Sequence, residues 1–177
     1  MNDYSTDCLT ERHFLLFGTI THWFAKYEML MQQIMATVAG SDYISVKLLT
    51  LSLNFGQKHA TLFNLLRHGR LPFDQYDRIS AFLQVPYALL PLRNDIAHSI
   101  WVARPPSNSI QPDWIFNYPP SILPVYEGLG EPNRHFMAHI QEEACYTLAD
   151  LDTVAVNLAT NYSEFSEYLR KVGLITP

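Results

Sequence analysis

The chain has 177 residues, of which 48% are hydrophobic and 16% charged, so it holds enough apolar side chains for a folded domain and lacks the composition of a disordered segment. Its net charge of −5 argues against a general nucleic-acid coat protein, although a small basic cleft is compatible with it. No apolar run approaches the ~20 residues of a membrane span, and the first residues lack the basic region of a secretory signal. Cys8 and Cys145 lack the spacing of a metal site, and nothing requires them to form a disulfide. We therefore expect a protein of the reducing cytoplasm.

The N-terminal third predicts two long helices. Apolar residues recur every three or four positions from about residue 9 to 38, and Gly40 ends that pattern. Ser41 and Asp42 can cap a second helix from about residue 43 to 68, in which we interpret Gly56 as a point of close helix packing. The apolar stripe of this second helix is Ile44, Leu48, Leu51, Phe55, Leu62, Leu65 and Leu66.

A third helix is expected from about residue 74, with Asp74 as its N-cap. Its predicted core positions are Tyr76, Ile79, Phe82 and Leu83. Pro86 and Pro91 remove backbone donors and predict a kink or a short break at about residues 85 to 91. The helix is then expected to resume and to reach about residue 102, with an apolar face made of Leu92, Ile96 and Ile100.

The segment from about residue 103 to 146 is rich in proline and apolar, and we expect it to be a partly extended excursion from the helices. Residues 114–116 and 123–126 have the pattern of short strands or ordered coil. Residues 135–146 are compatible with a strand or a helix, and the extended form is favoured. Thr147 with Asp150 has the spacing of a capping box and predicts a last helix to about Lys171, which Gly173 ends.

Together, these four amphipathic helices predict an all-α fold, an up-down four-helix bundle with a kinked third helix, in one domain over residues 1–177. The broad apolar stripes leave room for a dimer face. Aromatic residues at helical spacing are most simply explained as core: Trp23, Phe24, Tyr27, Phe55 and Phe63.

Polar residues that can do chemistry interrupt the apolar pattern in the segment 93–98, which contains Arg93, Asn94 and His98. On a helix, Asn94 and His98 share a face, and Arg93 lies about 100° from Asn94 at its edge. If Pro91 lies in a first helical turn, Arg93 also lies near a helix N-terminus, which favours an anion. Arginine can brace two phosphate oxygens, histidine can transfer protons near neutral pH, and asparagine can orient either group. Because RNA supplies its own 2′-hydroxyl nucleophile, this set of side chains needs no metal.

This segment resembles the R-x(4–6)-H signature of the HEPN superfamily in its common form R-N-x-x-x-H, here Arg93, Asn94 and His98. The likeness is sharp over the motif and only architectural elsewhere. It implies a helical bundle that forms a homodimer, in which two copies of the motif meet in one composite site. It also implies a metal-independent endoribonuclease that leaves a 2′,3′-cyclic phosphate, with Arg93 at the phosphate and His98 in proton transfer. Such proteins include toxins and phage-defence effectors, so an antitoxin is an expected partner.

Two other interpretations stay open. HEPN relatives that do not cleave RNA bind a nucleotide or a protein partner, and the acidic charge of the chain favours this alternative. In a purely structural interpretation, Arg93 pairs with Asp95 or another acid, Asn94 caps a kinked turn and His98 packs under Trp101. Asp95 is also expected to adjoin the phosphate position, where its charge would raise the pKa of the histidine but repel the substrate.

The sequence gives weaker support to a separate RNA-binding cleft and to a metal site. Lys58, Arg67 and Arg70 could line one wall of an RNA cleft, although an ordinary solvated helix face is the simpler explanation. His135 and His139, with Glu142 and Glu143, could bind a metal only if they lay on a helix, and the extended form is favoured there. No E-x-x-H pair and no glycine-rich phosphate loop occur, so neither a metal nor a cofactor is predicted.

Overall fold

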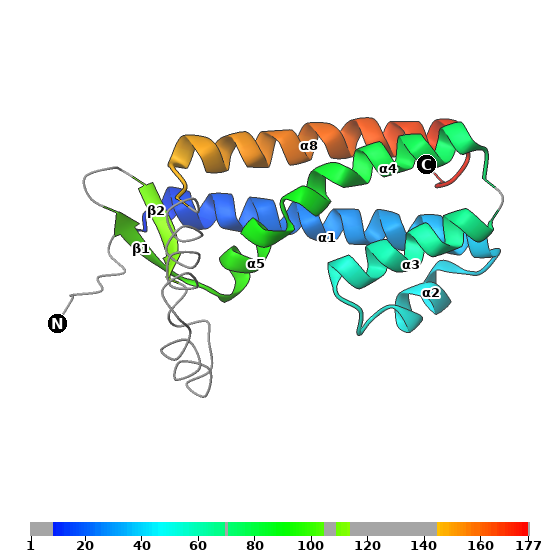
Figure 1. The fold of residues 1–177 in the computed structure, drawn as a ribbon, viewed down its shortest axis with the longest axis horizontal. Helices are drawn as coiled ribbons and strands as arrows, with labels where there is room; N and C mark the ends of the chain where they lie inside the picture. The colour runs from blue at the N-terminus through cyan, green and yellow to red at the C-terminus, as the bar shows by residue number, and fades with distance from the viewer. Residues whose placement is uncertain (1–8, 70, 105–108, 114–144, 177) are drawn as a thin grey trace, which may run out of the picture. The chain divides into compact units, whose positions relative to one another are not determined.

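A computed structural model of the chain describes residues 9–69, 71–104, 109–113 and 145–176. The described chain is mostly helical, with one two-stranded antiparallel sheet (Figure 1). Its elements are α1 (Glu11–Ala39), α2 (Tyr43–Leu49), α3 (Phe55–His68), α4 (Phe73–Ala88), α5 (Leu90–His98), β1 (Ile100–Arg104), β2 (Ser109–Asp113) and α8 (Leu148–Lys171). This content agrees with the predicted class at the level of a mainly helical protein.

The chain divides into two compact units, which are described separately. Unit 1 contains residues 1–19 and 91–155, and unit 2 contains residues 20–90 and 156–177. The helices α1 and α8 therefore contribute residues to both units. The single domain expected over residues 1–177 stays a prediction.

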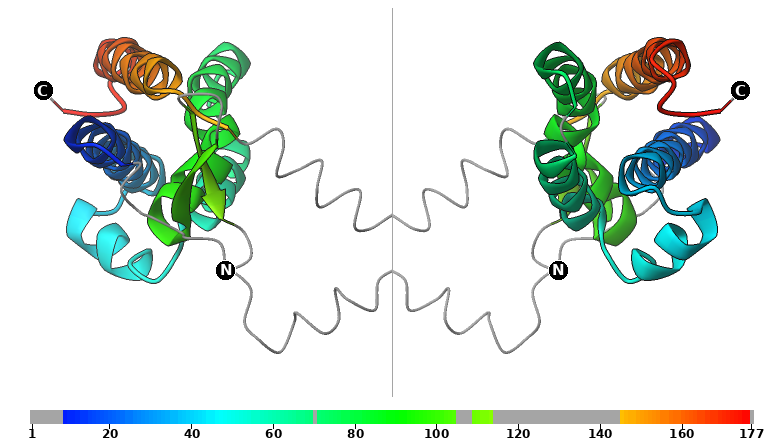
Figure 2. Two further views of the ribbon diagram at one scale, coloured as in Figure 1. Left: turned by 90° about the vertical axis from the view of Figure 1, so that its left-hand side faces the viewer. Right: turned by 90° about the vertical axis from the view of Figure 1, so that its right-hand side faces the viewer.

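Unit 2 is built from helices that pack through large buried side chains. α8 runs beside α1 in Figure 1 and in the end views of Figure 2, and the Tyr27 hydroxyl donates to the Leu158 carbonyl oxygen at 3.2 Å. The ring of Phe24 on α1 meets that of Phe55 on α3 with centroids 5.2 Å apart. α4 joins α8 through a stacked ring pair, Phe82 and Phe165, at 5.1 Å. These apolar contacts come from the stripes that the sequence pattern places inward.

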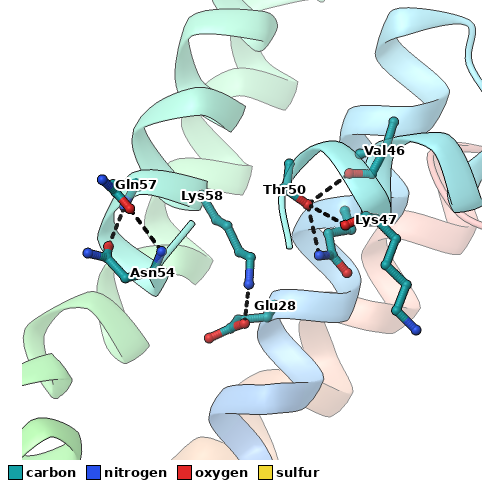
Figure 3. Close-up of polar contacts among 8 residues, drawn as sticks. Glu28, Val46, Lys47, Thr50, Asn54, Gln57 and Lys58 are labelled. Atoms are coloured by element: carbon teal, nitrogen blue, oxygen red, sulfur yellow. Dashed lines mark hydrogen bonds and ion pairs between the residues drawn. The ribbon is translucent and has the colours of Figure 1, made fainter. Parts of the chain in front are cut away.

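The second predicted helix is two helices, α2 and α3, with a break at residues 50–54. Thr50 turns its hydroxyl back to the Val46 carbonyl oxygen at 2.8 Å, and Asn54 forms a capping box with Gln57 (Figure 3). Both side chains offer the backbone a hydrogen bond that competes with a continuous helix. The predicted stripe is therefore wrong in its first half, where Ile44, Leu48 and Leu51 are exposed.

The close packing expected at Gly56 is found at Gly69 instead. A Cβ atom at Gly56 would meet its nearest neighbour at 3.5 Å, which is an ordinary van der Waals contact. At Gly69, directly after α3, a Cβ would lie 2.5 Å from Val38 Cγ1. The chain can therefore pass Val38 at this turn only because Gly69 has no side chain.

The third predicted helix is confirmed in part. It begins at Phe73 after Pro72, so Asp74 lies in its first turn and is not the N-cap. The expected break is real, because α4 ends at Ala88 and α5 begins at Leu90. Of the predicted core positions, Ile79, Phe82 and Leu83 are buried and Tyr76 is half-buried.

In unit 1, α5 ends at His98 and not at residue 102, because the chain turns into β1 at Ile100. β1 pairs antiparallel with β2, with Trp101 opposite Pro112. The apolar residues at this point therefore belong to a hairpin, whose start precedes the expected excursion. Residues 114–144, which include the predicted segments 114–116 and 123–126, lie outside the described ranges.

The last helix follows the predicted start and end signals. The Asp150 backbone N–H donates to Thr147 Oγ1 at 3.1 Å, and the Thr147 N–H donates to Asp150 Oδ2 at 2.8 Å, so the capping box is formed. Gly173 follows α8 with a φ of 72°, which is the left-handed conformation expected of a terminating glycine. Among the described helices, none is long and apolar enough to cross a membrane.

Candidate functional site

The three motif residues all lie on α5, which begins at Leu90 and has Pro91 in its first turn, as the sequence predicts. Asn94 and His98 are exposed and Arg93 is half-buried. Leu92, in contrast, is only 3% exposed and anchors the opposite side of the helix. Since successive residues are about 100° apart on a helix, α5 can bury Leu92 and still present the motif side chains outward.

Arg93 bonds to Asn94, and within the described ranges no acid forms an ion pair with it. Its Nη1 donates to Asn94 Oδ1 at 3.3 Å. The ion pairs among the described residues are Arg12–Asp152 and Lys58–Glu28, so neither involves Arg93. Its Nε is buried and has no hydrogen-bond partner in the part of the chain that is described. Among the described residues the guanidinium therefore pairs with no acid, and an arginine in that state can bind the oxygens of an anion.

The contacts expected from a purely structural role are not those that the structure contains. Arg93 bonds to Asn94 and forms no ion pair with Asp95 among the described contacts. The Trp101 ring packs against Phe17 at 4.8 Å and against Tyr146 at 5.9 Å, while His98 is exposed at the end of α5. In the part of unit 1 that the structure describes, His98 and Asn94 therefore stay exposed on the polar face of α5.

Asp95 lies on the inner side of α5, contrary to the expectation that it adjoins the phosphate position. It is 5% exposed, and it follows the buried Leu92 by three positions, which places the two about 60° apart around the helix. Arg93 is two positions away, about 200° around the same helix. Burial raises the pKa of the Asp95 carboxyl from 3.8 to about 6, because the interior disfavours its charged form.

The charge of Asp95 acts on Tyr146, at the start of the segment that leads into α8. Burial is the main cause that raises the pKa of the Tyr146 phenol, and the negative charge of Asp95 raises it further. Tyr146 is fixed by two backbone hydrogen bonds with Ile110 of β2, at 2.9 and 2.8 Å. The buried Asp95 of α5 and the Tyr146 that pairs with β2 are therefore close enough for the charge of one to act on the other.

The basic residues of α3 do not form one wall. The Lys58 ammonium is buried and lies 2.5 Å from Glu28 Oε2 (Figure 3), so it is already neutralised by an acid. Arg67 is exposed and donates from Nε to the Tyr76 hydroxyl at 3.3 Å. Nine positions separate Lys58 from Arg67, which puts them about 180° apart on α3. Arg70 lies outside the described residues.

Metal-binding side chains do not gather in the described part of the chain, where no group of three or more His, Cys, Asp or Glu residues is placed to hold an ion. His135, His139, Glu142 and Glu143 lie outside the described residues, so that segment stays a sequence interpretation.

Sequence patterns assign Trp23 to the core, but the structure leaves it half-buried. Its ring lies 5.3 Å from that of Tyr162, and the Lys26 ammonium lies 5.1 Å from each ring centroid. The only sequence signal for this group was Lys26 three positions after Trp23 on one helix face, because Tyr162 is far away in the chain.

Comparisons with models of protein families, with curated proteins and with solved structures find no match for this chain.

Proposed function

We propose that this protein is a metal-independent endoribonuclease of the HEPN type, built on an up-down four-helix bundle and active as a homodimer. The observation that carries the proposal is the outer face of α5, where Arg93 and Asn94 are hydrogen-bonded and His98 is exposed. This face combines a cation that has no ion pair among the described residues with a side chain that can transfer protons. Those are the two groups that phosphodiester cleavage by an internal nucleophile requires.

In this mechanism, the 2′-oxygen attacks the adjacent phosphorus and the bond from phosphorus to the 5′-oxygen breaks. One His98 takes the proton of the 2′-hydroxyl, and His98 of a second copy gives a proton to the departing 5′-oxygen. Arg93 braces the non-bridging oxygens as their negative charge grows, and Asn94 holds the guanidinium in place. The products are a 2′,3′-cyclic phosphate and a 5′-hydroxyl.

A second candidate is a non-catalytic HEPN-like module that binds a nucleotide or a protein partner such as an antitoxin. The net charge of −5 favours it, because a polyanion is repelled by an acidic protein unless the local charge is positive. The same Arg93 face would then hold a phosphate without cleaving it.

Incubation of the chain with mixed RNA in excess chelator distinguishes the two candidate functions. Wild type is expected to cleave, and His98→Ala is expected to lose at least about a hundredfold in rate, since general acid–base groups contribute about 10²- to 10⁴-fold. His68→Ala is the matched control, because His68 is also exposed at the end of a helix. Equal activity in wild type and His98→Ala, or binding without cleavage, contradicts the ribonuclease and favours the binding module.

A further inference from the structure

Unit 2 contains a half-buried aromatic and cationic group formed by Trp23 and Lys26 of α1 with Tyr162 of α8. The two rings are tilted by 46°, with centroids 5.3 Å apart, and the Lys26 ammonium lies 5.1 Å from both. The exposed His22 meets the edge of Trp23 at 5.8 Å. These side chains therefore offer flat ring surface and a positive charge together, at a place that solvent reaches.

The Lys26 charge is not balanced by a carboxylate among the described residues. The ion pairs found there use Arg12 and Lys58, and Lys26 takes part in neither. Its neighbours three and four positions away on α1 are His22, Trp23, Met29 and Leu30. The corresponding neighbours of Tyr162 on α8 are Leu158, Ala159, Phe165 and Ser166. None of these eight neighbours is an acid, although the chain as a whole has a net charge of −5.

A ligand that matches such a surface has a planar ring and a phosphate within one side-chain length of each other. A base that stacks on Trp23 takes the position over the ring that the Lys26 ammonium occupies, and the phosphate of the same nucleotide binds the displaced ammonium. Lysine suits this exchange, since its ammonium sits on a flexible four-carbon stem. A duplex does not fit, because its bases are stacked on one another and not available to a protein ring.

We propose that Trp23, Lys26 and Tyr162 form a binding site for one nucleotide of single-stranded RNA. Trp23 and Tyr162 supply the stacking surface, and Lys26 binds the backbone phosphate. This site deepens the proposed ribonuclease function and rests on it for the identity of the substrate. It lies outside the Arg93 motif and belongs to unit 2, while the motif belongs to unit 1.

The test measures binding of the whole chain to a labelled 2′-O-methyl RNA oligonucleotide, which cannot be cleaved because its 2′-oxygen is blocked. Trp23→Leu is expected to weaken binding of the single strand about five- to hundredfold, the range for loss of one stacked base. Lys26→Gln is expected to reduce the slope of log affinity against log salt by about 0.7, the value for one single-strand phosphate. Lys26→Arg should restore the wild-type slope.

The matched control is Lys47→Gln, which removes an exposed lysine on α2 and should change neither affinity nor slope. Thermal unfolding of each variant shows whether it is folded, and Lys26→Gln, which removes only a charge, decides the outcome if Trp23→Leu does not fold. Unchanged affinity and slope in Lys26→Gln overturn the site, as does equal binding of the duplex and the single strand.

The cleavage assay separates this inference from the proposed function. If wild type cleaves RNA and Lys26→Gln binds as wild type does, the site is wrong and the ribonuclease stands. If neither wild type nor any variant cleaves RNA, but Lys26→Gln and Trp23→Leu lose single-strand binding, the site stands and the ribonuclease is wrong.

Discussion

Arg93 and Asp95 are two positions apart in the chain, yet Arg93 is half-buried and Asp95 is buried. Helical periodicity predicts this difference in burial, since Asp95 lies beside the buried Leu92 once the segment is known to be helical. The placement of Arg93, Asn94 and His98 on one helix was therefore predictable from sequence. The burial of Lys58 was not, because its partner Glu28 lies thirty positions away on another helix and only tertiary packing brings them together.

The buried Asp95 carboxyl makes stability depend on pH. Between its ordinary pKa of 3.8 and its native value of about 6, the folded chain keeps a proton that the unfolded chain has lost. The free energy of unfolding that Asp95 contributes therefore falls as pH rises from about 4 through 6, by at most about 3 kcal/mol.

Asp95→Asn is expected to remove this dependence and to be more stable than wild type at pH 8. Denaturant unfolding at pH 4 and pH 8 measures the difference between the two chains. Asp77→Asn replaces an exposed acid on α4 and should leave the free energy of unfolding as in wild type at both pH values. A wild-type stability that rises with pH relative to Asp95→Asn contradicts the burial of this carboxyl.

Arg93→Lys tests the role of the guanidinium fork. Lysine keeps the positive charge but cannot brace two oxygens of a phosphate in one plane. We expect the rate of RNA cleavage to fall at least about tenfold while binding of a 2′-O-methyl RNA changes less, because the fork acts on charge that grows in the transition state. Equal losses in binding and rate would assign Arg93 to substrate affinity alone.

Among the secondary-structure elements, helix ends were predictable where a capping residue or a terminating glycine occurs, as at Thr147, Gly40 and Gly173. Asn54 and Gln57 have the spacing of a capping box and so also indicate the start of α3. The apolar spacing continues across this point, however, and led to the prediction of one continuous helix. The hairpin after α5 was missed for a different reason. Short apolar runs fit a helix or a strand equally well until their partner strand is known.

The capping box of α3 predicts a local stability effect. Asn54→Ala removes the acceptor for the Gln57 backbone N–H, which lies 2.9 Å away, and should lower the free energy of unfolding by about 1 kcal/mol. Asn64→Ala changes the same residue type at an exposed position inside α3, where alanine favours helix, so it should be neutral or slightly stabilising. Equal effects of the two changes in denaturant unfolding would contradict a separate start for α3.

The two glycines Gly69 and Gly18 should respond in opposite directions to alanine. At Gly69 the new Cβ would overlap Val38 Cγ1, and such overpacking costs about 1–3 kcal/mol. At Gly18, inside α1, a Cβ meets nothing within 4 Å, so alanine should stabilise by about 0.5–1 kcal/mol. Thermal unfolding checks both, and Val38→Ala should relieve the Gly69→Ala defect if the overlap is its cause.

At the scale of the whole molecule, the sequence predicted a mainly helical protein because long stripes with a 3.6-residue period leave few other folds. The proposed bundle and dimer rest on the likeness of one short motif. A dimer would have twice the 20.4 kDa mass of the chain, which sedimentation measures directly. If each site needs two copies of α5, the cleavage rate per chain should fall as dilution separates the dimer. A rate per chain that is independent of concentration, in a monomer, contradicts the composite site.

We propose above that the Arg93 face cleaves RNA through the 2′-oxygen of the substrate without a metal. The most direct test of this proposal is the chemistry of the ends left when the wild-type chain is incubated with RNA in excess chelator. We expect 2′,3′-cyclic phosphate and 5′-hydroxyl ends from the wild-type chain and none from His98→Ala. Ends with a 3′-hydroxyl and a 5′-phosphate, or cleavage that stops when the chelator is added, would contradict it.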